Sequence, residues 1–349
     1  MNRGEILRWL RETDEARLEE LWCRADDVRR DRVGDAVHLR GLIEFSSHCA
    51  RECGYCGLRA DNDALVRYRM PADEIMACVE KAVAFGYGTV VLQSGEDYGV
   101  TRDWLADLVR RVKGETNLAV TLSVGERSRE DLVAWREAGA DRYLLRFETS
   151  NRALFDRIHP PLPGKRSDRI ALVRLLQELG YAAGSGVMIG VPGQTYDDLA
   201  TDLETFRELD LEMIGVGPFL RHPATPLGVE DQSASPEDQV PASELMTYKV
   251  VALTRIVCPD SNIPSTTALA TLNLAQGREL GLARGANVVM PNLTPQQYRV
   301  LYEIYPAKAC IFEDGEACAQ CIKARVLAMG RKVGTGRGDA PRRAESANR

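Results

Sequence analysis

Three closely spaced cysteines, Cys49, Cys53 and Cys56, are the residues of this chain whose spacing most directly indicates chemistry. They form a C-x3-C-x2-C motif just after a predicted β-strand. Thiolates placed in this way can bind three irons of a cubane iron–sulfur cluster. A cluster with four cysteine ligands has every iron saturated and carries electrons, whereas here one iron stays open to an exchangeable ligand. The spacing therefore indicates a catalytic 4Fe–4S cluster.

Other roles are open to the same three cysteines. A tetrahedral zinc site needs a fourth ligand, and His48 adjoins Cys49 so closely in sequence that its reach is awkward. A disulfide is disfavoured because nine cysteines in a chain without an evident signal peptide point to metal or redox chemistry. Buried free thiols would not ordinarily gather in a loop flanked by glycine and arginine.

The composition sets the class of protein. The 349 residues suffice for one large barrel or two ordinary domains, and 44% apolar with 28% charged residues is ordinary for a globular protein. No apolar run is long enough to span a membrane, and the charged amino terminus lacks the apolar core of a signal peptide, so a cytoplasmic location is expected. The net charge is −6 and no basic stretch alternates with aromatics, so nucleic acid is not an expected partner.

Short β-branched runs alternate with helical patterns along most of the chain, which indicates a parallel sheet with crossover helices. Eight strands are predicted, at residues 37–43, 89–93, 119–123, 142–146, 185–189, 213–215, 262–265 and 287–290. Eight repeats favour an α/β fold that is a complete (β/α)8 TIM barrel. A six-stranded partial barrel with two further strands is the nearest alternative.

The remaining segments are assigned around this barrel, which is predicted over residues 36–300. Residues 1–35 hold two predicted helices that are expected to cover the bottom of the barrel. Residues 301–329 form a carboxyl-terminal extension with a second cysteine triplet, and residues 330–349 read as a flexible tail because they contain few apolar side chains.

In a barrel of this kind the active site lies at the carboxyl ends of the strands, where the cysteine loop also falls. The second strand ends in Ser94, Gly95 and Glu96. A small residue, a glycine and an acid allow the backbone to approach a ligand closely and offer a carboxylate to an ammonium group. Without the neighbouring cysteine loop, these residues would simply predict a turn.

Charged side chains follow the fourth strand. Arg146 and Glu148 are two residues apart and face the same way on a strand, so they pair with each other or with a polar ligand inside the barrel. Arg169 begins the next helical stretch and could hold a carboxylate in bidentate fashion. The other strand ends are small and polar, which suits a compact and anionic substrate.

A second triplet, Cys310, Cys318 and Cys321, follows the eighth predicted strand with C-x7-C-x2-C spacing. It could hold a second cluster, of 2Fe–2S or 4Fe–4S type, or a zinc ion. Free thiols are the alternative.

Together these segments resemble the radical S-adenosylmethionine (SAM) maturases of FeFe-hydrogenase, the HydE type, in the radical SAM group that includes biotin synthase and methylornithine synthase. The resemblance extends over residues 35–335 and rests on the terminal triplet and on segments 43–59, 92–97, 142–149, 191–195, 259–267 and 287–292. It implies a complete barrel that reduces SAM to methionine and a 5′-deoxyadenosyl radical. The implied substrate is a cysteine-bound iron carbonyl cyanide unit, on the way to the dithiomethylamine bridge of the hydrogenase H-cluster. The implied partners are other hydrogenase maturases and an electron donor such as ferredoxin or flavodoxin.

The resemblance also implies roles for individual residues. Cys49, Cys53 and Cys56 would hold the catalytic cluster, and Cys310, Cys318 and Cys321 an accessory cluster that varies in the family. The implied SAM contacts are Tyr55, Ser94, Gly95, Glu96, Glu148, Arg169 and Met290. The implied anion-accepting lumen is lined by Thr121, Arg146, Thr266 and Thr267, with Tyr302 near the cavity. Arg146 and Tyr302 are the implied catalytic side chains.

One residue departs from the family pattern, because Phe147 stands where histidine is expected. Strand alternation points Phe147 away from the lumen, so little effect is expected, although a different substrate would be the consequence if it mattered. Three rival functions are open. Methylornithine synthase is disfavoured by the terminal triplet, and biotin synthase by the lack of cysteines at the ends of strands three to five. An iron–sulfur scaffold or carrier would not need the SAM-like residues.

Overall fold

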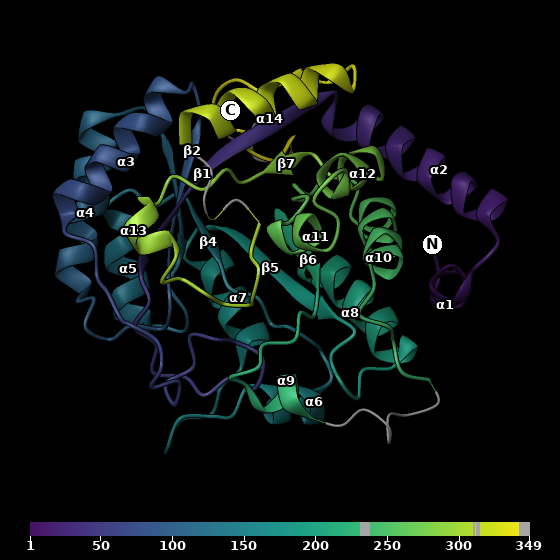
Figure 1. The fold of residues 1–349 in the computed structure, drawn as a ribbon, viewed down its shortest axis with the longest axis horizontal. Coiled ribbons are helices and arrows are strands. Elements are labelled where there is room, and N and C mark those ends of the chain that lie inside the picture. The colour runs from purple at the N-terminus through teal and green to yellow at the C-terminus, as the bar shows by residue number, and fades with distance from the viewer. Residues whose placement is uncertain (231–237, 310, 312–314, 342–349) are drawn as a thin grey trace.

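The computed structural model describes residues 1–230, 238–309, 311 and 315–341 of the chain (Figure 1). Its centre is a sheet of parallel strands in the order β6-β5-β4-β3-β2-β1-β7. The short strand β8 also pairs with β1, near the start of that strand. The strands are β1 (Ala36–Ser46), β2 (Thr89–Ser94), β3 (Ala119–Ser123), β4 (Arg142–Leu144), β5 (Ala182–Ile189), β6 (Met213–Pro218), β7 (Val288–Val289) and β8 (Lys332–Val333). The predicted α/β fold with a parallel sheet is therefore confirmed.

Helices surround these strands, with α3, α4 and α5 on one side and α8, α10 and α12 on the other (Figure 1). They are α1 (Arg3–Arg11), α2 (Glu15–Val33), α3 (Ala72–Ala84), α4 (Arg102–Glu115), α5 (Arg129–Glu137), α6 (Arg152–Ile158), α7 (Arg169–Glu178), α8 (Tyr196–Leu209), α9 (Pro226–Val229), α10 (Glu244–Val257), α11 (Thr267–Leu272), α12 (Gly277–Ala283), α13 (Gln296–Arg299) and α14 (Gly315–Ala328). No helix in the described part of the chain is long and apolar enough to cross a membrane.

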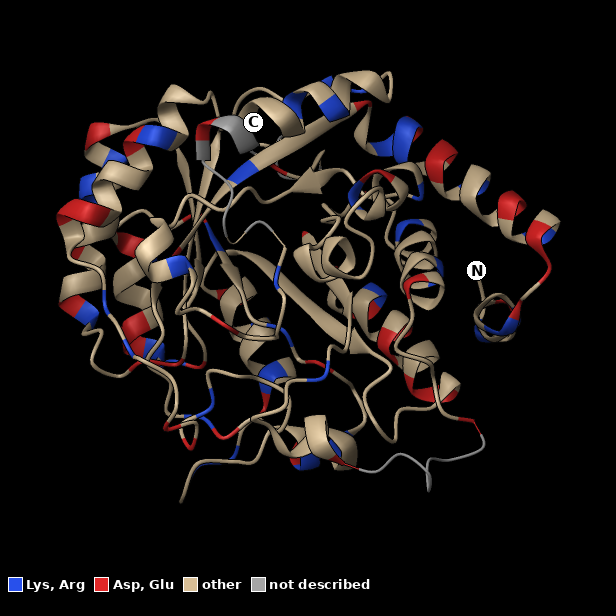
Figure 2. Cartoon of the chain, in the orientation of Figure 1, with Lys and Arg blue, Asp and Glu red and all other residues tan. Residues whose placement is uncertain are grey.

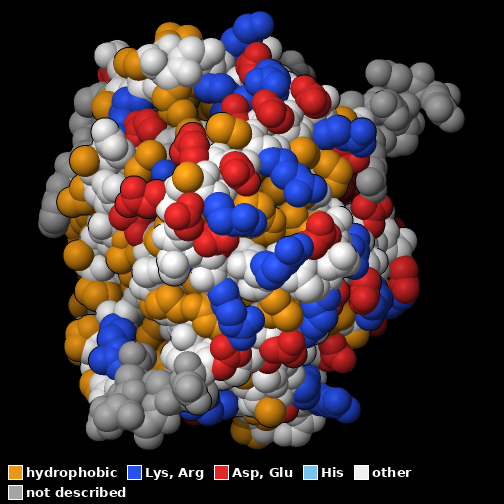
Figure 3. Space-filling model, turned by 90° about the vertical axis from the view of Figure 1, so that its right-hand side faces the viewer, with side chains coloured by type: hydrophobic (Ala, Val, Ile, Leu, Met, Phe, Trp, Pro, Cys, Tyr) orange, Lys and Arg blue, Asp and Glu red, His pale blue; other side chains and the backbone are white. Residues whose placement is uncertain are grey.

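Most of the helices begin where the sequence supplies a capping side chain, although α3, α12 and α13 do not. The Thr101 hydroxyl accepts from the Trp104 N–H at the start of α4, and Thr195 and Asp198 form a capping box at the start of α8. Their outer faces carry acidic and basic side chains intermixed, as the cartoon and the space-filling view show (Figures 2 and 3). Their inner faces pack on strands that are buried on both sides, and every residue of β5 is buried.

One predicted strand, at residues 262–265, is not a regular strand. Pro264 has no N–H to give to a neighbouring strand, which interrupts the ladder. The segment nevertheless bridges two strands: Asn262 pairs with Met213 of β6, and Pro264 pairs with Val288 of β7. The fourth strand is likewise shorter than predicted: β4 ends at Leu144, and Glu148, whose backbone is left-handed with φ 62°, makes an isolated bridge to Val187 of β5.

The two amino-terminal helices lie in the outer layer rather than across the bottom of the barrel as expected. Helix α1 packs against α8 and α10, and α2 packs against α10. The reason is an apolar stripe on α2, formed by Leu18, Leu21, Trp22 and Ala25, which is buried against α10. Helix α10 is consequently buried on nearly all of its residues.

The carboxyl-terminal segment differs from the predicted flexible tail. Its residues 332–333 form β8 against β1, and the Asp339 carboxylate pairs with the buried Arg142 guanidinium of β4. The Gly338 carbonyl accepts from Arg40 Nη2 at 3.0 Å. A Cβ on Gly88 would lie 1.5 Å from the Gly336 carbonyl oxygen, so the tail passes tightly beneath β2. Residues 342–349 lie outside the described residues.

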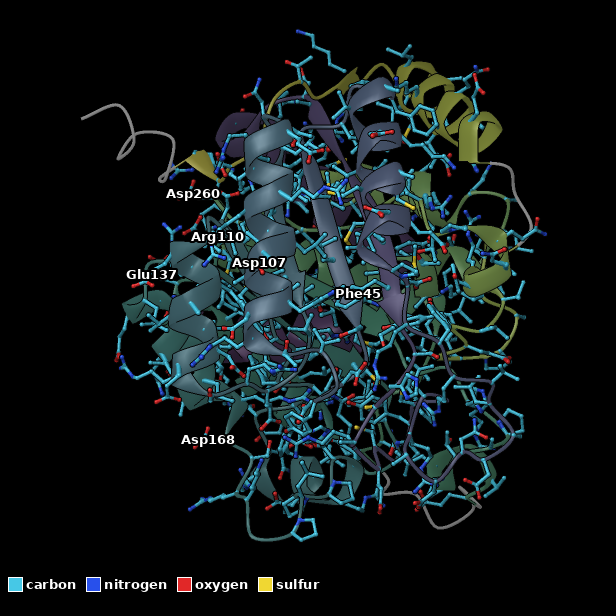
Figure 4. All side chains as sticks on the ribbon, turned by 90° about the vertical axis from the view of Figure 1, so that its left-hand side faces the viewer. Phe45, Asp107, Arg110, Glu137, Asp168 and Asp260 are labelled. Carbon is cyan, nitrogen blue, oxygen red and sulfur yellow. The ribbon has the colours of Figure 1, made fainter. Side chains whose placement is uncertain are left out.

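Removal of the Asp339 carboxylate should destabilise the fold strongly. Arg142 is 1% exposed, and without Asp339 its charge would stay buried without a carboxylate partner. We expect Asp339→Ala to lower the free energy of unfolding by about 3 kcal/mol in a urea titration. Asp107→Ala is the matched control, because Asp107 pairs with Arg110 on the exposed face of α4 (Figure 4) and should cost less than about 0.5 kcal/mol. Equal losses for the two variants would contradict the prediction.

A second buried acid, Asp202 of α8, has no basic partner among its hydrogen bonds. Its Oδ1 accepts from the Ser150 N–H and from the Ser150 hydroxyl, each at 2.6 Å. Burial raises the pKa of Asp202 to about 7, with the negative charges of Asp198 and Glu148 adding to the effect. The folded protein therefore holds a proton on Asp202 that the unfolded chain releases near pH 4.

This difference makes stability depend on pH in a defined direction. Because the pKa is raised by folding, the contribution of Asp202 is fully present below about pH 4 and is lost as the pH rises towards 7. Between pH 5 and pH 8 the free energy of unfolding should fall by about 2 kcal/mol relative to that of Asp202→Asn. Urea titrations of both proteins at the two pH values measure this, with Asp107→Asn as the control. Parallel pH curves for wild type and Asp202→Asn would disprove it.

Candidate functional site

The loop after β1 carries the three cysteines and is fixed by backbone hydrogen bonds to three other segments. The Ala50 N–H donates to the Glu96 carbonyl at 2.9 Å, the Gly54 N–H to the Ile158 carbonyl at 2.8 Å, and the Gly57 N–H to the Ile304 carbonyl at 3.0 Å. A Cβ on Gly57 would lie 2.1 Å from the Glu303 carbonyl oxygen, so only glycine fits there. The loop is thus held at the carboxyl ends of the strands as predicted.

The three thiols occupy this loop in buried or half-buried positions. Cys53 is buried, and Cys49 and Cys56 are half-buried. Burial raises the pKa of the Cys53 thiol to about 12, and it also raises the pKa values of Cys49 and Cys56. Without metal these groups are therefore thiols, and binding iron requires them to release their protons.

This donor set fits a cubane cluster with one open iron. The other described cysteines, Cys23, Cys78, Cys258 and Cys321, belong to or follow helices elsewhere in the fold and supply no fourth thiol to the loop. In the described ranges, no three His, Cys, Asp or Glu side chains are arranged to hold a single metal ion. A cubane needs thiolates spread over three corners, which the C-x3-C-x2-C loop provides.

Beside the loop lies a cavity of about 270 Å³ that residues of several strands line. Eight of the predicted site residues line it: Tyr55, Cys56, Thr121, Arg146, Glu148, Thr266, Thr267 and Met290. The structure brings these residues together from β3, the loop after β1, the residues after β4 and the segments around β7, which are distant in sequence. Ser94, Gly95, Glu96, Arg169 and Tyr302 lie outside this lining.

The end of β2 packs directly against the cysteine loop. A Cβ on Gly95 would lie 2.2 Å from the His48 carbonyl oxygen, so glycine is needed for this contact. The Glu96 N–H points at the Cys49 sulfur at 3.4 Å. The Glu96 carboxylate accepts from Arg51 Nε at 2.7 Å and from the Tyr98 hydroxyl at 2.7 Å. Its oxygens are thus held in place beside the cluster loop.

The pair predicted after the fourth strand also forms. Arg146 Nη2 and Glu148 Oε2 are 3.1 Å apart on the cavity wall. Within the described structure, Glu148 Oε2 has this ion pair but no aligned hydrogen bond, and Arg146 Nε is buried without a hydrogen-bond partner. Glu148 also has the left-handed backbone noted above, a costly conformation that is concentrated at functional sites. Unsatisfied polar atoms on a cavity wall are what a polar ligand would satisfy.

Arg169 leads to two residues that the sequence analysis missed, Glu126 and His159. Arg169 Nε donates to Glu126 Oε1 at 2.9 Å, and His159 Nε2 lies 3.2 Å from the same oxygen. Burial opposes the charge of Glu126, but the polar contact with His159 and the positive charge of Arg169 outweigh burial and lower the pKa of Glu126. The only available signal was an acid three residues beyond the end of the third predicted strand.

Further cavity residues were missed as well. Lys308 Nζ lies 2.7 Å from Glu44 Oε1, and both side chains are buried on the cavity wall. Arg40 also lines the cavity, and burial together with the nearby Arg142 lowers its pKa. Tyr302 is buried behind the wall with its hydroxyl 3.4 Å from Gln93 Nε2, while Tyr305 lines the cavity itself.

Phe147 does not face the cavity. Its ring is 1% exposed and lies 5.5 Å from the Phe206 ring of α8, measured between centroids. This is the orientation that strand alternation predicts. The residue therefore contributes to packing between β4 and α8.

The second cysteine triplet falls largely outside the described residues. Cys310 is outside them, and for Cys318 in α14 no side-chain position is described. Cys321 is exposed on α14. A cluster at this triplet stays a prediction.

Comparisons with known proteins agree with this geometry. A sequence profile described as Radical SAM superfamily matches residues 43–206. The chain is 48% identical to the FeFe hydrogenase maturase subunit HydE of Thermotoga maritima, over 90% of this chain and 87% of that protein. It is 29% identical to the 3-methylornithine synthase of Methanosarcina acetivorans, over 79% and 75% of the two chains. A crystal structure of methylornithine synthase superposes with a TM-score of 0.80 at 25% identity, over 95% of this chain and 94% of that one.

The buried thiols should react slowly with alkylating agents in metal-free protein. The reactive species is the thiolate, and a pKa of about 12 leaves Cys53 almost entirely protonated at pH 7.5. We expect Cys53 to react with iodoacetamide at least about 100-fold more slowly than the exposed Cys321, as followed by peptide mass spectrometry under anaerobic conditions. In urea-unfolded protein the two should react alike. Equal rates in the folded protein would contradict the described burial of the loop.

Proposed function

The chain belongs to the HydE family of FeFe-hydrogenase maturases within the radical SAM superfamily, and on this basis we propose its substrate and the roles of its site residues. It is a radical SAM enzyme that acts in hydrogenase maturation. We propose that it works on a cysteine-bound iron carbonyl cyanide unit, in a step towards the dithiomethylamine bridge of the H-cluster.

One observation carries the assignment of the site. Within the described residues, three thiols without a fourth cysteine share the loop after β1. One of them, Cys56, lines a cavity whose wall also holds the Arg146–Glu148 ion pair, with Arg146 Nε buried and without a hydrogen-bond partner. The proposed 4Fe–4S cluster on Cys49, Cys53 and Cys56 would supply one electron to SAM, giving methionine and the 5′-deoxyadenosyl radical. The protein residues have the separate task of binding and orienting the reactants.

The proposed SAM contacts surround the cysteine loop. Glu96 and Glu148 offer carboxylates to an ammonium group, and Arg169 offers a guanidinium to a carboxylate. Tyr55 and Met290, both on the cavity wall, are proposed to contact the nucleoside part. Ser94 and Gly95 allow the close approach of the backbone at the end of β2.

The cavity suits a small anion further from the cluster. Arg40 and Arg146 line it together with the hydroxyl-bearing Thr121, Thr266 and Thr267. The Arg40 guanidinium donates to the Met213 sulfur and to the Gly338 carbonyl, and it has no ion pair within the described residues. A cyanide-bearing iron unit is compact and negatively charged, so it would be attracted to this part of the lumen. Arg146 and Tyr302 are the proposed catalytic side chains, although the Tyr302 hydroxyl lies near Gln93 Nε2, outside the cavity lining.

Three finer points are part of the same proposal. Residues 262–264 bridge β6 and β7 and would take the place of the missing strand that closes the barrel between them. Cys310, Cys318 and Cys321 would hold an accessory cluster. The proposed partners are the other hydrogenase maturases and a low-potential electron donor such as ferredoxin or flavodoxin.

The proposal is tested by two linked assays on anaerobically reconstituted protein. Reduced wild-type protein should cleave SAM to 5′-deoxyadenosine, and Cys53→Ser should lower this by at least about 1,000-fold because one iron ligand is lost. Cys321→Ser is the control and should retain cleavage. Added as the sole bridge-forming maturase to apo-FeFe-hydrogenase, the wild type should restore hydrogen evolution.

The two assays separate the parts of the proposal. Cleavage that persists in Cys53→Ser would refute the cluster assignment. Intact cleavage without hydrogen evolution would refute the substrate and leave a radical SAM enzyme with another small substrate, as in the methylornithine synthase relatives.

A further inference from the structure

A buried histidine lies directly against one of the cluster cysteines. His159 Nδ1 is 3.0 Å from Cys53 Sγ, and the His159 side chain is fully buried. The residue follows α6, and its ring packs against Phe155 with 5.0 Å between centroids. His159 is 106 positions from Cys53 in sequence, so tertiary folding brings the two side chains together.

The neighbours of His159 decide which ring nitrogen carries the proton. Arg169 Nη2 lies 3.1 Å from Nε2, and a guanidinium nitrogen can only donate. Nε2 must therefore accept. Glu126 Oε1, also near Nε2, already receives hydrogen bonds from the Ser167 hydroxyl at 2.5 Å and from Arg169 Nε at 2.9 Å, so it does not require the imidazole proton. The proton is accordingly assigned to Nδ1, which faces the sulfur.

The protonation state of an iron-bound Cys53 leads separately to the same assignment of the proton to His159 Nδ1. A thiolate bound to iron has no proton to donate, so Nδ1 must carry the hydrogen for a contact at 3.0 Å to be attractive. The result is an N–H···S hydrogen bond to a cluster ligand. Hydrogen bonds to cluster sulfurs are among the factors that set the reduction potential of an iron–sulfur cluster.

We propose that His159 tunes the catalytic cluster by donating its Nδ1–H to the Cys53 thiolate, which raises the reduction potential, and that Glu126 is the positioning residue for this bond. The direction follows from charge: the reduced cluster is more negative than the oxidised one, so a donor to its sulfur stabilises the reduced form more. The inference rests on the proposed function only in assuming that the cluster occupies the three-cysteine loop.

Glu126 connects this bond to the residues proposed to hold SAM. Its Oε2 lies 2.8 Å from Arg51 Nη2, and Arg51 Nε donates to Glu96 Oε1 at 2.7 Å. Its backbone N–H donates to Glu96 Oε2 at 2.9 Å. One carboxylate therefore positions Arg169, which donates to His159 Nε2, and, through Arg51, Glu96. Loss of the Glu126 charge should change the potential and the SAM KM together, whereas loss of the His159 donor should change the potential without a comparable change in KM.

The test is an anaerobic redox titration of the reconstituted cluster followed by electron paramagnetic resonance (EPR), in the full-length protein without SAM. His159→Phe should shift the midpoint potential to a more negative value. His159→Asn should return it towards wild type, because an asparagine amide N–H can occupy nearly the same place as Nδ1–H. Glu126→Gln should shift the potential in the same direction as His159→Phe and also raise the KM for SAM.

His222→Phe is the matched control. His222 is a second buried histidine that packs against Gly57 of the cluster loop, and its Nδ1 accepts from the Ala224 N–H at 3.1 Å rather than facing a sulfur. Its substitution should leave the midpoint potential at the wild-type value. A wild-type potential in His159→Phe at equal cluster content would overturn the inference. A failure of the wild type to bind a cluster at all would instead overturn the proposed function.

A spectroscopic measurement covers the case in which His159→Phe does not fold. In protein labelled with 15N-histidine, pulsed EPR of the reduced cluster should detect coupling to one histidine nitrogen, and this coupling should vanish in labelled His159→Asn. The chain has only four histidines, so the assignment can be checked by single substitutions. Absence of any histidine coupling in the wild type would overturn the inference without use of a variant.

Discussion

The buried carboxylate of Glu126 is the interaction on which the geometry of the site depends. It lies beyond the end of β3, pairs with Arg51 of the cysteine loop and with Arg169 at the start of α7, and accepts from the Ser167 hydroxyl. The His159 ring, at the end of α6, lies beside it and accepts from the same Arg169. Burying a charge costs free energy unless it is paired and hydrogen-bonded, and Glu126 meets that condition on both oxygens. If any of these partners moved away, the buried charge of Glu126 would lose part of its pairing. The cysteine loop and the residues after β2 and β4 are therefore held in one arrangement.

The sequence alone was sufficient for features that depend on local spacing. The cysteine motif located the loop, β-branched runs located seven strands of the sheet, and alternation along β4 correctly turned Phe147 away from the lumen. The segment 262–265 was misjudged as a regular strand because one proline removes a ladder donor, although its two bridges keep it between β6 and β7. Local patterns were thus reliable wherever every residue in the run could hydrogen bond in the same way.

The parts that could not be predicted depend on contacts between distant segments. His159 and Glu126 carry no motif, and each is meaningful only because folding brings it to the cluster loop. Arg40 and the Glu44–Lys308 pair are isolated charges in strands or loops, which usually lie at the surface. The tail was predicted to be flexible from its low apolar content. In the fold, Asp339 pairs with the buried Arg142, and the Gly338 carbonyl accepts a hydrogen bond from the buried Arg40. The Gly336 carbonyl passes so close to Gly88, just before β2, that a Cβ there would clash. Amino-acid composition indicates only how a segment behaves on average, whereas these contacts depend on individual residues of the tail.

The pairing of β1 with β8 has a consequence for how the protein is made. Strand β1 is near the start of the chain, yet one of its partners is at residues 332–333 and another, β7, is at residues 288–289. During synthesis β1 can pair with β2 early, but its other edge stays unpaired until β7 and β8 have been made. Contacts of such large sequence separation are formed slowly, and an unpaired strand edge attracts other chains in the meantime. During synthesis the first strand is therefore exposed on one side until residues 288–333 have been made, and this is the stage at which a chaperone would be of most use.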